Sequence, residues 1–146
     1  MRNFSISVDI AAPAVRVWTV MRDVERWHEW TPSITSVELL DGTFEVGHRA
    51  RVRQPKLLPA VFEIAAVEEG RSFTWVTRRP GVVATAAHLV EPVANGSRVT
   101  LSLRFDGPLG GVIGWFARGL NERYLTLEAN GLKRRAEQPA GAGGAP

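Results

Sequence analysis

Three short turns, at residues 69–70, 80–81 and 95–96, separate segments in which apolar and polar residues alternate. A period of two is typical of a strand that buries one face. Because a two-residue turn pairs its flanking strands symmetrically, the apolar side of one strand determines the inward side of the next. The chain from about residue 60 to residue 105 is therefore predicted to form antiparallel hairpins with one common buried face.

The strand predicted at residues 99–105 identifies this face, because its apolar residues alternate with polar ones. Counting back through the turns predicts that His88 lies opposite Leu103. The same count predicts that Trp75 lies opposite Ala86 on one neighbouring strand and opposite Ile64 on the other. The inward residues predicted in this way are Phe62, Ile64, Trp75, Thr77, Ala84, Ala86, His88, Leu101 and Leu103.

The N-terminal part of the chain predicts a strand followed by two short helical pieces. Apolar residues alternate over residues 4–10, as in a half-buried strand. Pro13 then precedes apolar residues at helical spacing, so a short helix is expected to end near Asp23. A second helical turn or structured loop up to Pro32 leads into a further strand at residues 34–40.

The C-terminal part predicts one long amphipathic helix over residues 109–137. Four glycines in its first turns are expected to bend or fray its start. Its predicted apolar stripe comprises Leu109, Ile113, Phe116, Leu120, Tyr124, Leu127 and Gly131, and it leaves Glu128 outside.

The composition is that of one globular domain. The chain has 146 residues, 45% hydrophobic and 23% charged, so we expect a single domain over residues 1–137 and a disordered Gly/Ala/Pro tail over residues 138–146. The formal net charge is only +3, and no aromatic residues interleave with the arginines, so no nucleic-acid partner is predicted. Neither a long apolar run nor a signal-peptide pattern occurs, which predicts a cytoplasmic protein without stable membrane insertion.

The residue types also limit the chemistry. Without cysteine there is no disulfide, thiolate metal site or cysteine nucleophile. Three histidines without a ligand-spaced partner argue against a metal site. No phosphate loop, dinucleotide fingerprint or nucleophile elbow occurs, so we expect no cofactor.

Several local motifs together resemble the START-like, helix-grip SRPBCC superfamily, and specifically its polyketide cyclase/dehydrase and lipid-transport group. The similarity covers about residues 3–137. It rests on Ile10-Ala11-Ala12-Pro13 with Val17-Trp18, Asp23, the block from Trp27 to Pro32, Val46-Gly47, the segment from His88 to Pro92, the segment from Gly96 to Thr100 and the helix end from Leu132 to Glu137. The resemblance implies an α+β fold in which a curved antiparallel sheet of about seven strands grips the C-terminal helix, with two short helices between strands one and two.

The resemblance also implies a cavity for a hydrophobic small molecule between sheet and helix. Small inward residues such as Ala84 and Ala86 agree with open space there, whereas the bulky inward residues are able to fill it. The residues expected to contact a ligand are Trp27, Trp30, Val52, Phe62, Ile64, Trp75, Thr77, Ala86, Leu101, Leu103, Phe116 and Leu120. For Leu57 and Leu58, at a predicted hairpin tip, three readings stay open: packing under the loop, the lip of the cavity, or a membrane-touching tip.

Two residues are candidates for proton chemistry in this cavity. His88 is the imidazole that the register places inside, and it is either a general base or a hydrogen-bonded core histidine. Tyr124, the only tyrosine, is either a ligand-facing donor or a satisfied core hydroxyl.

Two functions therefore stand as hypotheses, and a third ranks below them. The first is binding or transport of a lipid, acyl chain, sterol or aromatic polyketide-like molecule. The alternative is a cofactor-free polyketide cyclase, aromatase or dehydratase, and the third is a module that binds a protein partner. Trp115 is expected on the outer side of the helix, where it forms either a dimer contact or a contact with the first strand or the helix start. The protein is therefore predicted to be a monomer or a homodimer.

Overall fold

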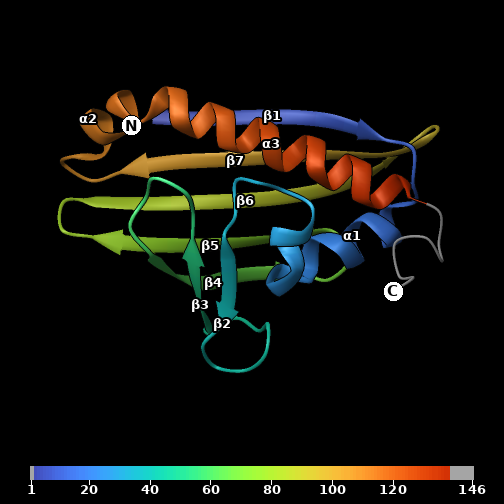
Figure 1. Cartoon of the computed structure of the whole chain (residues 1–146), viewed down its shortest axis with the longest axis horizontal. Helices are drawn as coiled ribbons and strands as arrows, with labels where there is room; N and C mark the ends of the chain where they lie inside the picture. The colour runs from blue at the N-terminus through green and yellow to red at the C-terminus, as the bar shows by residue number, and fades with distance from the viewer. Residues whose placement is uncertain (1, 139–146) are drawn as a thin grey trace.

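A computed structural model describes residues 2–138 and shows a seven-stranded antiparallel sheet with a long C-terminal helix across one face (Figure 1). The strands are β1 (Arg2–Ile10), β2 (Ser36–Leu39), β3 (Arg49–Arg53), β4 (Ala60–Glu68), β5 (Ser72–Arg79), β6 (Val82–Val93) and β7 (Gly96–Asp106). Their order is β1-β7-β6-β5-β4-β3-β2, so β1 pairs with the last strand and the others form a meander. The predicted helix-grip fold is confirmed. From residue 139 on, the predicted tail lies outside the described residues.

The strand register in the middle of the sheet matches the prediction. Trp75 pairs with Ala86 across the turn between β5 and β6. Ile64 pairs with Trp75, although the register of β4 shifts between Ile64 and Ala66. This irregularity offsets a longer turn between β4 and β5, so the predicted pairing at Ile64 holds.

The register between β6 and β7 differs from the prediction by two residues. His88 pairs with Leu101, and not with Leu103, because the turn is formed by residues 94–95. Gly96 is the first residue of β7, and a side chain there is excluded because a Cβ atom would overlap the carbonyl oxygen of Ile10 in β1. Since side chains alternate with a period of two, a shift of two residues leaves the predicted inward face unchanged.

The helices follow the predicted order, with one division. Helix α1 (Ala14–Arg22) and the 3-10 helix η1 (Val24–Glu29) lie between β1 and β2. The C-terminal helix is divided into α2 (Gly110–Phe116) and α3 (Arg118–Glu137) by Ala117, which ends the first hydrogen-bonded segment. Of the helices formed by residues 2–138, none is long and apolar enough to cross a membrane.

The predicted apolar stripe is wrong for the first half of the C-terminal helix. Leu109, Ile113 and Phe116 are 48%, 36% and 76% exposed, whereas the prediction placed them inward. The buried residues of α2 are Gly110 and Gly114, and Gly110 lies against the backbone at the end of β7. Helix α2 therefore packs through its glycines and turns its large apolar side chains outward.

Helix α3 is fixed at its C-terminal end by side chains from the first helix and its own last turn. The Arg16 guanidinium donates to the carbonyl oxygen of Ala136 at 3.1 Å and to other carbonyls of that turn, which satisfies groups without a partner in the helix. The Glu137 carboxylate accepts from the Ala11 backbone N–H at 2.8 Å. The hydrogen bond from Lys133, and then that from Ala11, hold the pKa of Glu137 below its ordinary value.

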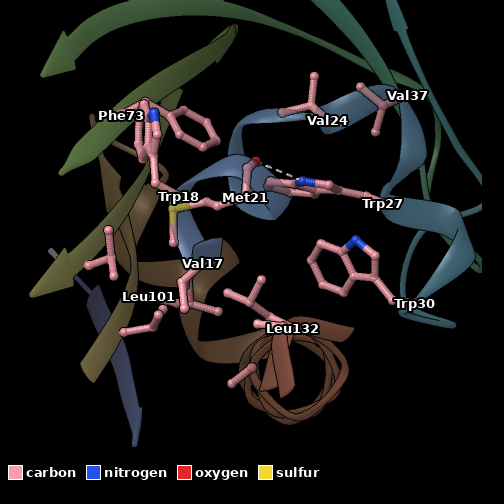
Figure 2. Close-up of a cluster of buried hydrophobic side chains, with 14 of the residues drawn as sticks. Val17, Trp18, Met21, Val24, Trp27, Trp30, Val37, Phe73, Leu101 and Leu132 are labelled. Carbon is pink, nitrogen blue, oxygen red and sulfur yellow. Dashed lines mark hydrogen bonds between the residues drawn. The ribbon is translucent and has the colours of Figure 1, made fainter. Parts of the chain in front are cut away.

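The main hydrophobic core fills the space under α1 and η1 (Figure 2). The indole N–H of Trp27 donates to the Met21 carbonyl oxygen at 2.9 Å, which joins η1 to the end of α1. The side chains labelled around this contact are Val17, Trp18, Val24, Trp30, Val37, Phe73, Leu101 and Leu132. They occupy the space between one half of the sheet and the C-terminal half of α3.

Candidate functional site

A cavity of about 80 Å³ lies between the inward face of the sheet and α3. One face of α3 forms its helix wall, β3 to β7 form its sheet wall, and η1 contributes Trp27. The lining residues are Trp27, Ile34, Val52, Gln54, Phe62, Trp75, Ala86, Ala87, His88, Leu101, Ser102, Leu103, Asn121, Tyr124, Leu125 and Glu128. The wall is mostly apolar and carries a few polar side chains, which is the usual composition of a small-molecule site.

Most of the predicted site residues lie in this wall. The structure places both candidates for proton chemistry, His88 and Tyr124, at the cavity. The predicted ligand-contacting residues that line it are Trp27, Val52, Phe62, Trp75, Ala86, Leu101 and Leu103. They come from separate elements, which only the strand register and the packing of η1 bring together.

Five predicted residues lie outside the wall. Ile64 is fully buried in the main core, and Trp30 packs against Gly131 of α3. Thr77 is half-buried on β5, beyond the lining residues, and Leu120 is half-buried on α3. The inward position predicted for Phe116 is wrong, because this side chain belongs to the outward face of α2.

A buried histidine and a buried glutamate face each other across the cavity wall. His88 of β6 is 4% exposed and Glu128 of α3 is 9% exposed. The imidazole Nε2 lies 3.6 Å from the carboxylate Oε1, which is an ion-pair distance and longer than a direct hydrogen bond. Sheet and helix thus bring one imidazole and one carboxyl group together in a mostly apolar wall.

The surroundings of His88 determine which of its nitrogens faces the carboxylate. Nδ1 lies 3.2 Å from the backbone carbonyl oxygen of Phe73, and a carbonyl only accepts, so Nδ1 carries a proton. The imidazole stacks on the Phe73 ring with a centroid distance of 4.1 Å and an interplanar angle of 9°. With its orientation set in this way, Nε2 is the ring nitrogen that faces Glu128.

Two further polar side chains of α3 line the cavity. The hydroxyl of Tyr124 donates to the carbonyl oxygen of Pro55, so it holds the loop between β3 and β4 against α3. Asn121 is 9% exposed, and its amide Nδ2 is buried without a hydrogen-bond partner among the described residues. A buried donor without a partner is costly, so Nδ2 is a position where a ligand acceptor gains a hydrogen bond.

Sequence reasoning missed both Asn121 and Glu128. The predicted stripe followed the large apolar side chains, whereas the buried face runs through the small residues Gly110 and Gly114 and then through polar residues of α3. A stripe drawn from Tyr124 and Leu132 alone, using spacings of three and four, includes both polar residues.

The comparison with protein families identifies the group to which this fold and cavity belong. The model for polyketide cyclase/dehydrase and lipid transport matches residues 1–137. The chain belongs to this family. Membership in the polyketide cyclase/dehydrase and lipid-transport family supports a role in binding a hydrophobic ligand or in cyclisation. A search of curated protein sequences returns no match.

Solved structures share the fold at low sequence identity. The Zhui aromatase/cyclase from Streptomyces sp. R1128 is 19% identical, with a TM-score of 0.75 over 99% of both chains. TTHA0849 from Thermus thermophilus is 18% identical, with a TM-score of 0.74 over 92% of this chain and 97% of that one. The di-domain aromatase/cyclase BexL of the BE-7585A biosynthetic pathway is 18% identical, with a TM-score of 0.71 over 92% of this chain and 46% of BexL. At these identities the similarity establishes the fold alone.

Proposed function

We propose that this protein binds a small hydrophobic molecule in the cavity between the sheet and α3. The observation that carries the proposal is a mostly apolar wall that includes Asn121, whose buried amide Nδ2 has no hydrogen-bond partner among the described residues. Apolar walls supply affinity by removing ligand surface from water, and a few polar groups orient the ligand. The family to which the chain belongs supports the same role.

The wall chemistry favours a compact ring system with a hydrogen-bond acceptor such as a ketone oxygen. Sites that enclose drug-sized ligands hold about 300–1,000 Å³. The cavity here holds about 80 Å³, because Trp27, Phe62 and Trp75 occupy much of the space. A larger ligand therefore requires movement of the half-buried Phe62 or of the loop that Tyr124 holds.

Native mass spectrometry of gently purified protein, followed by solvent extraction, tests this proposal. We expect a co-purifying hydrophobic compound at near-equal stoichiometry. The variant Ala86→Phe fills the cavity and should lose the compound, whereas Thr85→Val, at the neighbouring position of the same strand, should retain it. Retention by Ala86→Phe would place the ligand elsewhere.

The contact between His88 and Glu128 favours a second candidate function, a polyketide cyclase or dehydratase. In this scheme Nε2 of His88 removes a proton from the carbon next to a ketone, and the Glu128 carboxylate stabilises the imidazolium. The enolate oxygen accepts from Asn121, and the enolate carbon attacks a second ketone. The imidazolium returns its proton to the new alkoxide, and loss of water completes the cyclisation. Tyr124 becomes a donor to the ligand only when it leaves the Pro55 carbonyl.

A poly-β-ketone analogue tests this second function. His88→Ala and the shape-conserving His88→Gln should both abolish cyclisation above the uncatalysed rate while retaining analogue binding. Glu128→Gln should lower the rate and change its pH profile. Unchanged turnover in His88→Ala would remove the base and leave binding as the function of the cavity.

A further inference from the structure

Helix α2 and the residue before it expose five large apolar side chains at one end of the molecule. Phe116 is 76% exposed, Trp115 and Val112 are each 54% exposed, and Leu109 and Ile113 are 48% and 36% exposed. The rings of Trp115 and Phe116 pack edge to face with their centroids 4.9 Å apart. Single exposed apolar residues are ordinary, but a contiguous group of this kind marks an interaction surface.

The loop between β3 and β4 adds two leucines to the same end. Leu57 is 42% exposed and Leu58 is 76% exposed, so they are not packed under their loop. The guanidinium of Arg79 donates to the carbonyl oxygen of Pro59 at 2.8 Å, which ties the loop to the end of β5.

The turn between β5 and β6 joins this loop to α2. The backbone N–H of Leu109 donates to the carbonyl oxygen of Gly81 at 2.8 Å. Figure 1 shows α2 and this turn at the same end of the sheet. We call this surface the apolar end, and it consists of Leu57, Leu58, Leu109, Val112, Ile113, Trp115 and Phe116.

Basic side chains accompany the apolar end. Lys56 precedes the two leucines, Arg79 borders the turn, and Arg118 and Arg123 follow α2. All four are exposed, and none forms an ion pair with another side chain of residues 2–138. Their positive charge is thus available to a partner.

The nearby acidic side chains leave most of this charge uncompensated. Glu63 contacts Arg78 at 3.6 Å, and Asp106 contacts Arg104 at 2.7 Å. Glu122 lies on the side of α3 that faces β1, where it borders a groove with residues of that strand. The apolar end is therefore bordered by an excess of positive charge.

We infer that the apolar end docks on the surface of an anionic lipid bilayer. Trp115 is of the residue type enriched at the membrane interface, and Phe116 and Leu58 supply apolar groups that bury among the acyl chains. The four basic side chains attract anionic headgroups. A second copy of this chain fits less well, because a twofold interface would bring two sets of unpaired basic side chains together.

This inference rests on the outer surface and is independent of the ligand proposed for the cavity. Docking through the apolar end would also determine how the cavity is oriented toward the bilayer. Tyr124 lines the cavity and bonds to Pro55, three residues from Leu58. Docking of the loop on a bilayer thus brings the cavity wall close to the source of hydrophobic molecules.

Co-sedimentation of the full chain with lipid vesicles tests the docking. We expect binding to vesicles of phosphatidylcholine with one third phosphatidylglycerol and weak binding to phosphatidylcholine alone. Trp115→Ser/Phe116→Ser should reduce binding by about tenfold or more. Lys56→Gln and Arg118→Gln should each reduce it by about fivefold. Raising NaCl from about 0.1 M to about 1 M shortens the Debye length from about 10 Å to about 3 Å and should weaken binding.

The double replacement Val15→Ser/Val46→Ser is the matched control, since both valines are exposed outside the apolar end. It should bind the vesicles as the unmodified protein does. Failure of the unmodified protein to bind anionic vesicles at low salt overturns the inference. So does self-association that Trp115→Ser/Phe116→Ser abolishes in the absence of vesicle binding, which would identify a second copy as the occupant.

Discussion

The imidazole Nε2 of His88 lies 3.6 Å from the carboxylate Oε1 of Glu128, although the two residues belong to a strand and a helix far apart in sequence. Both side chains are buried in the cavity wall, so bulk water cannot replace either partner. Removal of one partner leaves the other polar group buried alone. The two positions are therefore energetically coupled.

A double-mutant cycle measures this coupling. His88→Ala and Glu128→Ala should each lower the free energy of unfolding by about 2–4 kcal/mol, and the double variant should lose less than their sum by about 1–3 kcal/mol. Urea denaturation gives the three values. The exposed pair Arg51 and Glu38, 3.1 Å apart, is the control and should couple by less than about 1 kcal/mol. Simple additivity at His88 and Glu128 would contradict the buried contact.

Close packing of η1 and the following residues on α3 depends on one glycine. A Cβ atom at Gly131 would overlap the carbonyl oxygen of Trp30, so Gly131→Ala should destabilise the fold by about 2–4 kcal/mol. Gly119→Ala, on the same helix with nothing within 4 Å of the added atom, should instead stabilise it by about 0.5–1 kcal/mol. Thermal unfolding of both variants measures these changes in stability. Equal changes in the two variants would contradict the close approach at Gly131.

The unpartnered amide of Asn121 should lower the free energy of unfolding and should make the cavity prefer ligands that carry a hydrogen-bond acceptor. Asn121→Leu removes a buried donor and should raise the free energy of unfolding by about 1 kcal/mol. Calorimetric titration with tetralone and with its hydrocarbon analogue tetralin should show a preference for the ketone that this variant loses. If the variant keeps the preference, another group binds the ketone oxygen. If neither compound binds to the unmodified protein, the result counts against the proposed cavity function itself.

The stability contributed by Glu137 should depend on pH in the acid range. Its folded-state pKa is depressed below the ordinary 4.5, so its contribution is complete above that value and is lost as the pH falls through the folded pKa. Glu137→Gln should therefore lower the free energy of unfolding at pH 7 by about 0.5–1 kcal/mol, after allowance for solvent screening. The difference between variant and unmodified protein should close as the pH falls below 4.5. A constant difference from about pH 7 to about pH 3 would exclude the charge as its cause.

The hydrogen bond from Tyr124 to Pro55 should control motion of the loop between β3 and β4. Tyr124→Phe removes the hydroxyl while keeping the ring, and it should lower the free energy of unfolding by about 1 kcal/mol. Hydrogen exchange should then accelerate in residues 54–59, with little change in the strands. Unchanged loop exchange would mean that the contacts from Arg79 to Pro59 and from Gln54 to Ser33 hold the loop without Tyr124.

The alternation of apolar residues was sufficient to predict the sheet and most of its cavity wall. Leu101 was assigned inward from the alternation of its own strand, and Trp75 and Ala86 by counting back through the turns, and all three line the cavity. The turn between β6 and β7 was predicted one residue too late, but the predicted inward face is still correct. A register shift of two residues keeps every side chain on its face. The face on which a strand residue lies depends on whether its position is odd or even along the strand, and this can be read from the sequence.

The helix face was harder to predict, because much of it is formed by small and polar residues and not by large apolar ones. Gly110 and Gly114 are the buried residues of α2, whereas a search for an apolar stripe selects its large side chains, which are exposed. The prediction therefore placed Phe116 inside and Glu128 outside, and both assignments are reversed. The hydrogen bond of Tyr124 and the ion-pair contact of His88 depend on that packing, so sequence alone identified the side chains but not their partners.

The position of β1 next to β7 has a consequence for how the chain folds. Arg2 pairs with Phe105, so β1 meets its partner strand only after the other strands of the sheet have been synthesised. Strands β2 to β6 are neighbours in both sequence and sheet, so they are able to pair before β1 joins the sheet. Contacts between residues so distant in sequence slow folding, because a long loop must close before they form. Closure of the sheet by β1 is thus expected to be a late and rate-limiting event, and the same step completes the surface on which α3 docks.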